Sequence, residues 1–475
     1  MRDRTVSAVT ITAGLFATAA AALALLSAPA DSDLFWHLAS ANWMLDHGAL
    51  LDRDVFSFTR AGVPYQTGQW LGELILGLVF REWSWLGLVV LRAIIVGAAT
   101  FFACRAIGRM QPHVGWATLP AILVILESRA IWGDRPQLFS LALFPLVFDV
   151  LLATRLDGNA RRLLVIPPLF LAWANLHGAF TAGLALVVVF VVEALIRRDR
   201  TLLRGFGSVG LASVLASFVN PAGFRAIAAG ASYASAAGSL VAEEGPLDVL
   251  TARGAIFAAF LLASLGAALL LGREGIDRRV GPSALLWTGL IVPFALLGLA
   301  IQRQAPFACI VMAPFVASAV PTVLGRVTAL PPRVPVLAAG AFAVLAISAL
   351  ALEAALAAPR APDLARYPQS ALAPLSGTAG NLFNEYDWGG YLIYAAPDRP
   401  VFIDGRGGIL FVPDVLADFQ DAVRLRPNYR DVLAKWDIKV ALVRPDRPLA
   451  VALREEGWRV VAEQSDLWVL LERPR

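Results

Sequence analysis

Long apolar runs separated by short polar intervals fill about the first three quarters of the 475-residue chain. A helix that crosses a bilayer needs roughly 17–25 mostly apolar residues. About eleven such runs are predicted, at 5–27, 84–106, 114–128, 136–154, 162–176, 179–196, 205–219, 254–272, 282–301, 305–324 and 334–357. The pattern therefore predicts a polytopic α-helical membrane protein, whose membrane domain we place at 1–357.

After residue 357 the pattern changes to that of a soluble domain. A Pro/Ala-rich linker, 358–376, precedes residues 377–475, where short strand-like runs alternate with amphipathic helices. Strands are predicted at Gly380–Phe383, Pro400–Ile403, Ile438–Val443, Trp458–Glu463 and Leu467–Leu471. Helices are predicted at Trp388–Ala395, Val412–Leu425, Tyr429–Trp436 and Pro448–Glu456. This alternation predicts a small C-terminal α/β domain.

Composition and charge fit this interpretation and add an orientation. Hydrophobic residues make up 58% of the chain and charged residues only 16%, whereas a soluble domain has about 25% charged residues. Arginines concentrate in alternate loops, which places the N-terminus in the cytoplasm and, with an odd number of spans, the C-terminal domain outside. The net charge of +4 is explained by those loops and predicts no nucleic-acid partner. We therefore expect a multi-pass protein of the cytoplasmic (inner) membrane, in contact with membrane lipids.

The first outside loop, 28–84, carries the densest candidate chemistry. It opens with DSDLFWH at 31–37, and a helix starting near Leu34 would place Asp33 and His37 on one face. Trp36 would then face lipid, as interfacial aromatic residues do. A second amphipathic segment, 70–80, carries Glu73 on its polar side. These features predict a site and not a mere connection.

Two interpretations of the carboxylates at 31 and 33 stay open. Asp33, with Asp31 and His37 beside it, could take the proton from a sugar hydroxyl as a general base. Asp31 and Asp33 could also hold a divalent cation, Mg²⁺ or Mn²⁺, or one could raise the pKa of the other. Alternatively, they cap the helix that begins near Leu34, because Asp is favoured at that position.

The second outside loop, 127–137, contains two arginines that could bind a lipid phosphate. Arg129 and Arg135 are candidates because guanidinium groups bind phosphate oxygens bidentately. The alternative is a structural ion pair, either between Asp134 and Arg135 or between Glu127 and Arg129.

Four further polar residues are candidates with simpler alternatives. His177 could donate to a leaving phosphate or satisfy a helix-end carbonyl, and Arg303 is a second phosphate candidate. Glu243 could contact sugar hydroxyls or lie in a solvated loop. Arg92, roughly 12 Å into the second span, is a functional candidate or a side chain that snorkels to the surface.

Seven short motifs together resemble a known superfamily. They are DLFWHL at 33–38, DVFSFT at 54–59, WLGE at 70–73, WANLHG at 173–178, NPAG at 220–223, DWGGY at 387–391 and IDGR at 403–406. With the large first outside loop, these motifs resemble the GT-C superfamily of membrane glycosyltransferases, and within it a bacterial branch of the polyprenyl-phosphate-sugar-dependent type.

The resemblance implies an inverting hexosyl- or pentosyltransferase that uses a polyprenyl-phosphate sugar donor. It assigns the catalytic base to Asp33, with Asp31 second, and leaves the acceptor unidentified. Some relatives have adjacent acidic residues where this chain has Asp-Ser-Asp, so the resemblance leaves a metal requirement open. Two other functions stay open: a transporter or flippase of lipid-linked sugars, and a non-catalytic envelope scaffold.

Overall fold

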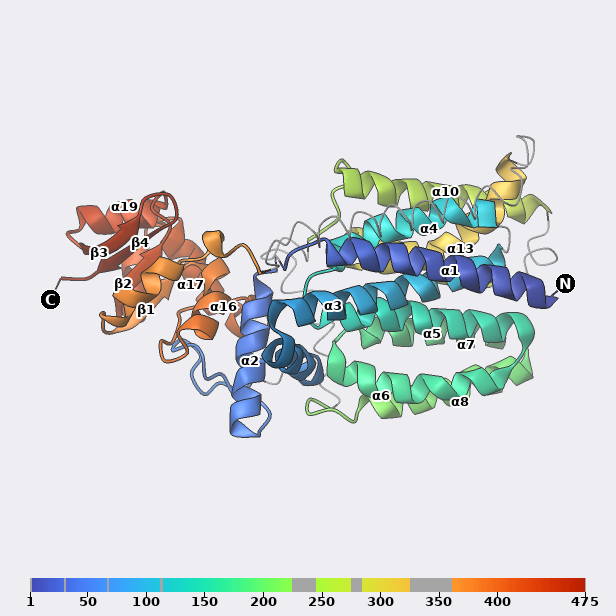
Figure 1. The fold of residues 1–475 in the computed structure, drawn as a ribbon, viewed down its shortest axis with the longest axis horizontal. Coiled ribbons are helices and arrows are strands. Elements are labelled where there is room, and N and C mark those ends of the chain that lie inside the picture. The colour runs from blue at the N-terminus through green and yellow to red at the C-terminus, as the bar shows by residue number, and fades with distance from the viewer. Residues whose placement is uncertain are drawn as a thin grey trace.

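The computed structural model describes residues 2–29, 31–65, 68–111, 114–223, 245–274, 284–324 and 361–474. A long bundle of helices forms one end of the molecule, and a small domain with a sheet forms the other (Figure 1). The helix α2 (Asp33–His47) lies across the end of the bundle, between these two parts.

The bundle consists of helices that follow the predicted apolar runs. They are α1 (Arg2–Leu25), α3 (Trp70–Met110), α4 (Val114–Ser128), α5 (Gln137–Asp157), α6 (Ile166–Leu176), α7 (Phe180–Ile196), α8 (Arg200–Ser217), α10 (Ala252–Glu274), α12 (Ala284–Ala300) and α13 (Ala305–Leu324). Short 3₁₀ turns include η1 (Arg129–Ile131), η2 (Ala160–Val165) and η4 (Gln302–Gln304). Among the described residues, α3 and α5 are long and apolar enough to cross a membrane, and several shorter helices are also apolar. The predicted run 334–357 lies outside the described residues, so eleven crossings stay a prediction.

The long helix α3 is interrupted at Ser84, whose backbone has φ 53° and ψ −148°. This break separates an amphipathic first part from the apolar second part, as the change of pattern at 84 predicts. Small residues let α1 pack closely on the second part. A Cβ atom at Gly108 would lie 2.4 Å from Val9, and one at Gly97 would touch α1 at Ala17 and Ala21. Small residues commonly allow such close approach between membrane helices.

The C-terminal domain has a four-stranded sheet in the order β1-β2-β4-β3. Its strands are β1 (Asn381–Asn384), β2 (Ile438–Val443), β3 (Arg459–Gln464) and β4 (Trp468–Glu472). Strands β1 and β2 are parallel, whereas β4 runs antiparallel to both β2 and β3. The helices are α16 (Tyr386–Ala395), α17 (Asp414–Val423), α18 (Tyr429–Lys435) and α19 (Pro448–Glu455). The predicted α/β domain is confirmed, although the strand predicted at Pro400–Ile403 is reduced to single bridges at Val401.

Those bridges connect the first loop to the sheet. Val401 pairs in parallel with Leu382 on one side and with Ser57 on the other. The Phe58 N–H donates to the Val401 carbonyl at 3.2 Å, and the Val401 N–H donates to Phe56 at 3.0 Å. The first loop therefore continues the sheet of the C-terminal domain at its β1 edge.

The two parts also share one hydrophobic core, which corrects the expected position of Trp36. Trp36, Phe56 and Tyr65 from the first loop pack in the same cluster as Leu382 and Trp388. Trp36 is only 4% exposed, so the prediction that it faces lipid is wrong. The C-terminal domain covers this face of α2, and burial against protein replaces the interfacial position.

Candidate functional site

Arg135 joins the two aspartates that the sequence singles out. Its Nε atom lies 3.0 Å from Asp31 Oδ2, and its Nη1 atom lies 2.8 Å from Asp33 Oδ2. Arg135 precedes Pro136 at the start of α5, so two segments about 100 residues apart in sequence meet at this point. The Asp33 side chain is 28% exposed, which leaves its carboxylate accessible beside the guanidinium.

Besides its ion pair with Arg135, Asp31 caps the start of α2, as the alternative interpretation predicted in part. Its Oδ1 atom accepts a hydrogen bond from the Asp33 N–H at 3.0 Å. Asp33 is the first residue of α2, where a negative charge is favoured by the helix dipole. Gly133 permits the second loop to come this close, since a Cβ there would lie 2.1 Å from Asp31 Oδ2.

One turn into α2, His37 meets Glu73 of α3. The His37 Nδ1 atom is 3.1 Å from Glu73 Oε1, and both side chains are buried. Burial, followed by the positive charge of Arg135 and the neighbouring His177, holds the pKa of His37 well below its usual value. A neutral imidazole beside a carboxylate donates through this nitrogen, so His37 is held in one orientation. The partner of His37 is thus Glu73 of α3.

His177 lies on the same side of the bundle, between two arginines. Its pKa is lowered to about 3 by burial and by the charges of Arg303 and Arg135. Its Nδ1 atom lies 2.8 Å from Ser140 Oγ and accepts from the Ala179 N–H at 3.3 Å. Nδ1 is therefore the acceptor, and the proton of the neutral ring is on Nε2. His177 does not bind a helix-end carbonyl through this atom.

The two ion pairs predicted within the second loop, Asp134–Arg135 and Glu127–Arg129, do not form, because each carboxylate binds a different arginine. Asp134 pairs with Arg92 instead, at 2.6 Å, and both side chains are almost fully buried. Burial raises the pKa of Asp134 to about 6 against the opposing effect of Arg92, and Asp31 raises it further. Arg92 also donates to the backbone carbonyls of Ala24 and Ser27. A buried guanidinium requires such partners, and Arg92 therefore holds α1, α3 and the second loop together.

The other suggested pair is replaced in the same way. Glu127 binds Arg253 of α10 at 2.8 Å. Arg129 lies on η1 and is exposed. Of the predicted substrate-binding residues, Arg135 and Arg303 act electrostatically on His177, whereas Glu243 lies outside the described residues.

The C-terminal domain covers the Asp33 side of α2 through glycines. A Cβ atom on Gly405 would lie 2.5 Å from Asp33 Oδ1 and 2.8 Å from the Trp36 ring. Gly390 of α16 makes a similar close approach, with a Cβ 3.3 Å from the Ser32 carbonyl. The turn at Gly405 is therefore in van der Waals contact with the candidate base, which the sequence did not predict.

Arg406 fixes that turn in place. Its guanidinium binds Asp404 through two hydrogen bonds, at 2.8 and 2.6 Å, and lies 2.7 Å from Asp54 of the first loop. All three side chains are completely buried, and the Phe56 and Tyr65 rings flank the guanidinium at about 5 Å. Burial alone would lower the pKa of Arg406, but the two carboxylates outweigh it and the pKa is raised. The IDGR motif thus links the first loop to the C-terminal domain.

The side chains around Asp31 and Asp33 can be compared with those that a divalent cation would need. The Arg135 guanidinium lies between the two carboxylates, in the position that a bridging cation would take. Within the described part of the chain, no group of three or more His, Cys, Asp or Glu side chains is placed to hold a metal. The residues as arranged suit a guanidinium, and we derive no step through a metal ion.

Comparisons with known proteins give matches only at the level of structure. No family model matches the chain, and no curated protein matches it. The archaeal oligosaccharyltransferase AglB from Archaeoglobus fulgidus, solved with an inhibitory peptide and a dolichol-phosphate, is similar over 92% of this chain and 69% of its own. That match has a TM-score of 0.58 and 11% identity. ArnT from Cupriavidus metallidurans, solved with undecaprenyl phosphate, matches over 99% of this chain and 98% of its own, with a TM-score of 0.50 and 13% identity.

The two matches extend over the bundle and the C-terminal domain together, since they cover 92% and 99% of this chain. At 11–13% identity the likeness shows the fold. The chain therefore shares the fold of AglB and ArnT, in line with the fold expected from the sequence.

Proposed function

We propose that this protein is a membrane glycosyltransferase, which transfers a sugar from a polyprenyl-phosphate donor to an acceptor hydroxyl. We place the reaction at the outer face of the cytoplasmic membrane. The observation that carries the proposal is the Asp33 carboxylate, which is partly exposed, held by Arg135 and grouped with two neutral histidines. The lipid phosphates named for AglB and ArnT support a donor of this class.

In this mechanism Asp33 removes the proton of the acceptor hydroxyl. The acceptor oxygen attacks the anomeric carbon of the sugar, and the bond from that carbon to the phosphate oxygen breaks. The electron pair leaves with the lipid phosphate, and attack from the opposite side inverts the configuration. Arg135 orients Asp33 through their 2.8 Å contact, so the base is positioned before the acceptor arrives.

The departing phosphate needs positive charge and hydrogen-bond donors. Arg303 is the first candidate because it lies near His177, whose Nε2–H can donate to a phosphate oxygen. Arg135 faces the same histidine and could contribute once Asp33 is protonated. Arg129 is exposed and would reach the phosphate only at the periphery. Attachment of the donor to lipid explains why the site lies at one end of an apolar bundle.

The polar residues of this site gather at one end of the bundle, which favours an enzyme over the other two functions. A transporter would place its polar site near mid-membrane, between broken helices. A scaffold would not need an accessible carboxylate, such as that of Asp33, close to arginines and buried histidines.

One experiment separates the three functions. The purified full chain in lipid nanodiscs or vesicles is incubated with a panel of radiolabelled polyprenyl-phosphate sugars and with a cell-envelope extract as the source of acceptor hydroxyls. Free lipid phosphate and donor flipping are then measured. Release of lipid phosphate with one of these donors is expected. Flipping without release would identify a transporter, and neither activity across the panel would leave the scaffold function.

A further inference from the structure

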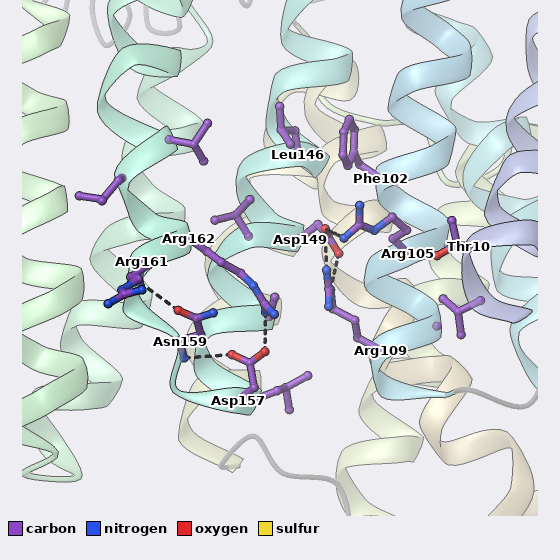
Figure 2. A pocket seen from close by; sticks show the side chains of 17 residues that line it. Thr10, Phe102, Arg105, Arg109, Leu146, Asp149, Asp157, Asn159, Arg161 and Arg162 are labelled. Atoms are coloured by element: carbon purple, nitrogen blue, oxygen red, sulfur yellow. Dashed lines mark hydrogen bonds and ion pairs between the residues drawn. The ribbon is translucent and has the colours of Figure 1, made fainter. Parts of the chain in front are cut away.

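A large cavity lies at the end of the bundle opposite α2 and the C-terminal domain. Its volume is about 1420 Å³, and α1, α3, α5 and η2 supply its lining (Figure 2). Helix α5 spans the distance between the two sites, because it starts beside Arg135 and its last residue, Asp157, lines the cavity. Its 21 residues extend about 31 Å, close to the thickness of the hydrocarbon core. The cavity is thus at the head-group level of the other leaflet.

The cavity is basic on two facing sides (Figure 2). On one side Arg105 and Arg109 share a single partner, the buried Asp149, at 3.3 and 2.5 Å. On the other side Arg162 is neutralised by Asp157 at 2.5 Å. Arg161 is exposed, and its guanidinium makes no ion pair with any described residue. Four arginines and two aspartates leave the lining with a formal charge of +2.

Apolar side chains lie next to this charge. Leu164, Val165 and Leu156 line the cavity and are 72%, 45% and 37% exposed. Such exposure is unfavourable in water but suits contact with acyl or isoprenoid chains. Basic pockets between membrane helices bind anionic lipid head groups.

We infer that this cavity binds one lipid with a negatively charged phosphate head group. Arg105 and Arg161 contact the phosphate from the two sides of the cavity, while Leu156, Leu164 and Val165 contact the hydrocarbon chain. The occupant is an anionic phospholipid of the bilayer or a polyprenyl phosphate, because both combine a phosphate with a long apolar chain. This inference does not rest on the proposed sugar transfer.

The test compares lipid retention by two double variants of the full chain. Arg105→Gln with Arg161→Gln removes the phosphate contacts and leaves the Arg109–Asp149 and Arg162–Asp157 pairs intact. Arg200→Gln with Arg204→Gln is the matched control, because these exposed arginines begin α8 at the same end of the bundle but do not line the cavity. Each protein is reconstituted with phosphatidylcholine alone, with added phosphatidylglycerol, or with added undecaprenyl phosphate. Bound lipids are then counted by native mass spectrometry.

We expect the wild type and the control variant to retain one anionic lipid per chain. The Arg105/Arg161 variant should bind it about thirtyfold more weakly, as expected when two arginines near a phosphate are lost. The preferred lipid, phosphatidylglycerol or undecaprenyl phosphate, identifies the source. Equal retention by all three proteins, or retention of phosphatidylcholine as strong as that of the anionic lipids, would overturn the inference. An unchanged thermal unfolding midpoint shows that weaker binding is not caused by misfolding.

Discussion

Replacing Gly405 by alanine tests whether the C-terminal domain helps to position the candidate base. The added Cβ atom would lie 2.5 Å from Asp33 Oδ1 and 2.8 Å from the Trp36 ring. An ordinary contact needs about 3.4 Å, so the turn or the carboxylate must move by about 0.9 Å. A misplacement of about 1 Å at a reacting group can reduce turnover about 100-fold. We therefore expect Gly405→Ala to lower kcat by about two orders of magnitude.

The assay is release of radiolabelled lipid phosphate with whichever donor the wild type consumes. Overpacking a buried contact costs about 1–3 kcal/mol, so the unfolding midpoint should fall only slightly while activity falls steeply. Gly377→Ala is the matched control in the same domain, because its Cβ would be 3.4 Å from the nearest atom, the Pro374 carbonyl oxygen. Wild-type turnover in a folded Gly405→Ala variant would refute the idea that this contact positions Asp33.

Three further predictions concern stability, pH and metal dependence. Arg406→Met should destabilise the protein by about 3–5 kcal/mol because Asp54 and Asp404 lose their buried partner. In thermal unfolding, Arg430→Met, which removes a surface pair, should leave the midpoint close to that of the wild type. Because the pKa of His177 is lowered to about 3, stability should fall as the pH decreases from 6.5 towards 3, where the unfolded chain binds a proton that the folded site excludes. Melting curves of His177→Gln should show a flatter pH dependence in that window, and an identical dependence would contradict the assignment. Because Arg135 already bridges the two aspartates, EDTA should leave turnover unchanged; loss of turnover that Mg²⁺ or Mn²⁺ restores would show that a cation replaces this guanidinium.

Periodicity and local composition predicted the elements of the fold. The helix beginning near Leu34, the change of pattern at Ser84 and the α/β alternation after residue 377 all follow from neighbouring residues. These features depend on interactions within a few turns or strands, so the sequence alone contains them. The strand expected around Val401 illustrates the limit, because its pairing depends on the first loop.

Partners distant in sequence could not be predicted from such patterns. Asp134 and Glu127 each have an arginine nearby in the second loop, yet they bind Arg92 and Arg253. Burial determines which arginine each carboxylate binds, because a buried arginine is destabilising without a carboxylate partner, whereas an exposed arginine is solvated by water. The sequence shows the charges but does not show which of them are desolvated.

The position of the C-terminal domain was the largest omission. Trp36 has the pattern of an interfacial aromatic residue, and nothing near it in sequence indicates that Gly405 packs against its ring. Two signals were present: the glycines beside Asp404 and Trp388, and the acidic Asp54 at the start of the DVFSFT motif. Their role is clear only from the structure, in which Arg406 forms an ion pair with Asp54.

The most direct test of the proposed function is the turnover of Asp33→Asn beside that of Asp46→Asn. Both residues lie on α2, but Asp46 is exposed and pairs with Arg81 at the surface. Loss of a general base reduces the rate about 10²- to 10⁴-fold, so Asp33→Asn should release almost no lipid phosphate while remaining folded. Asp46→Asn should match the wild type. Full release of lipid phosphate by a folded Asp33→Asn protein would contradict the assignment of Asp33 as the base.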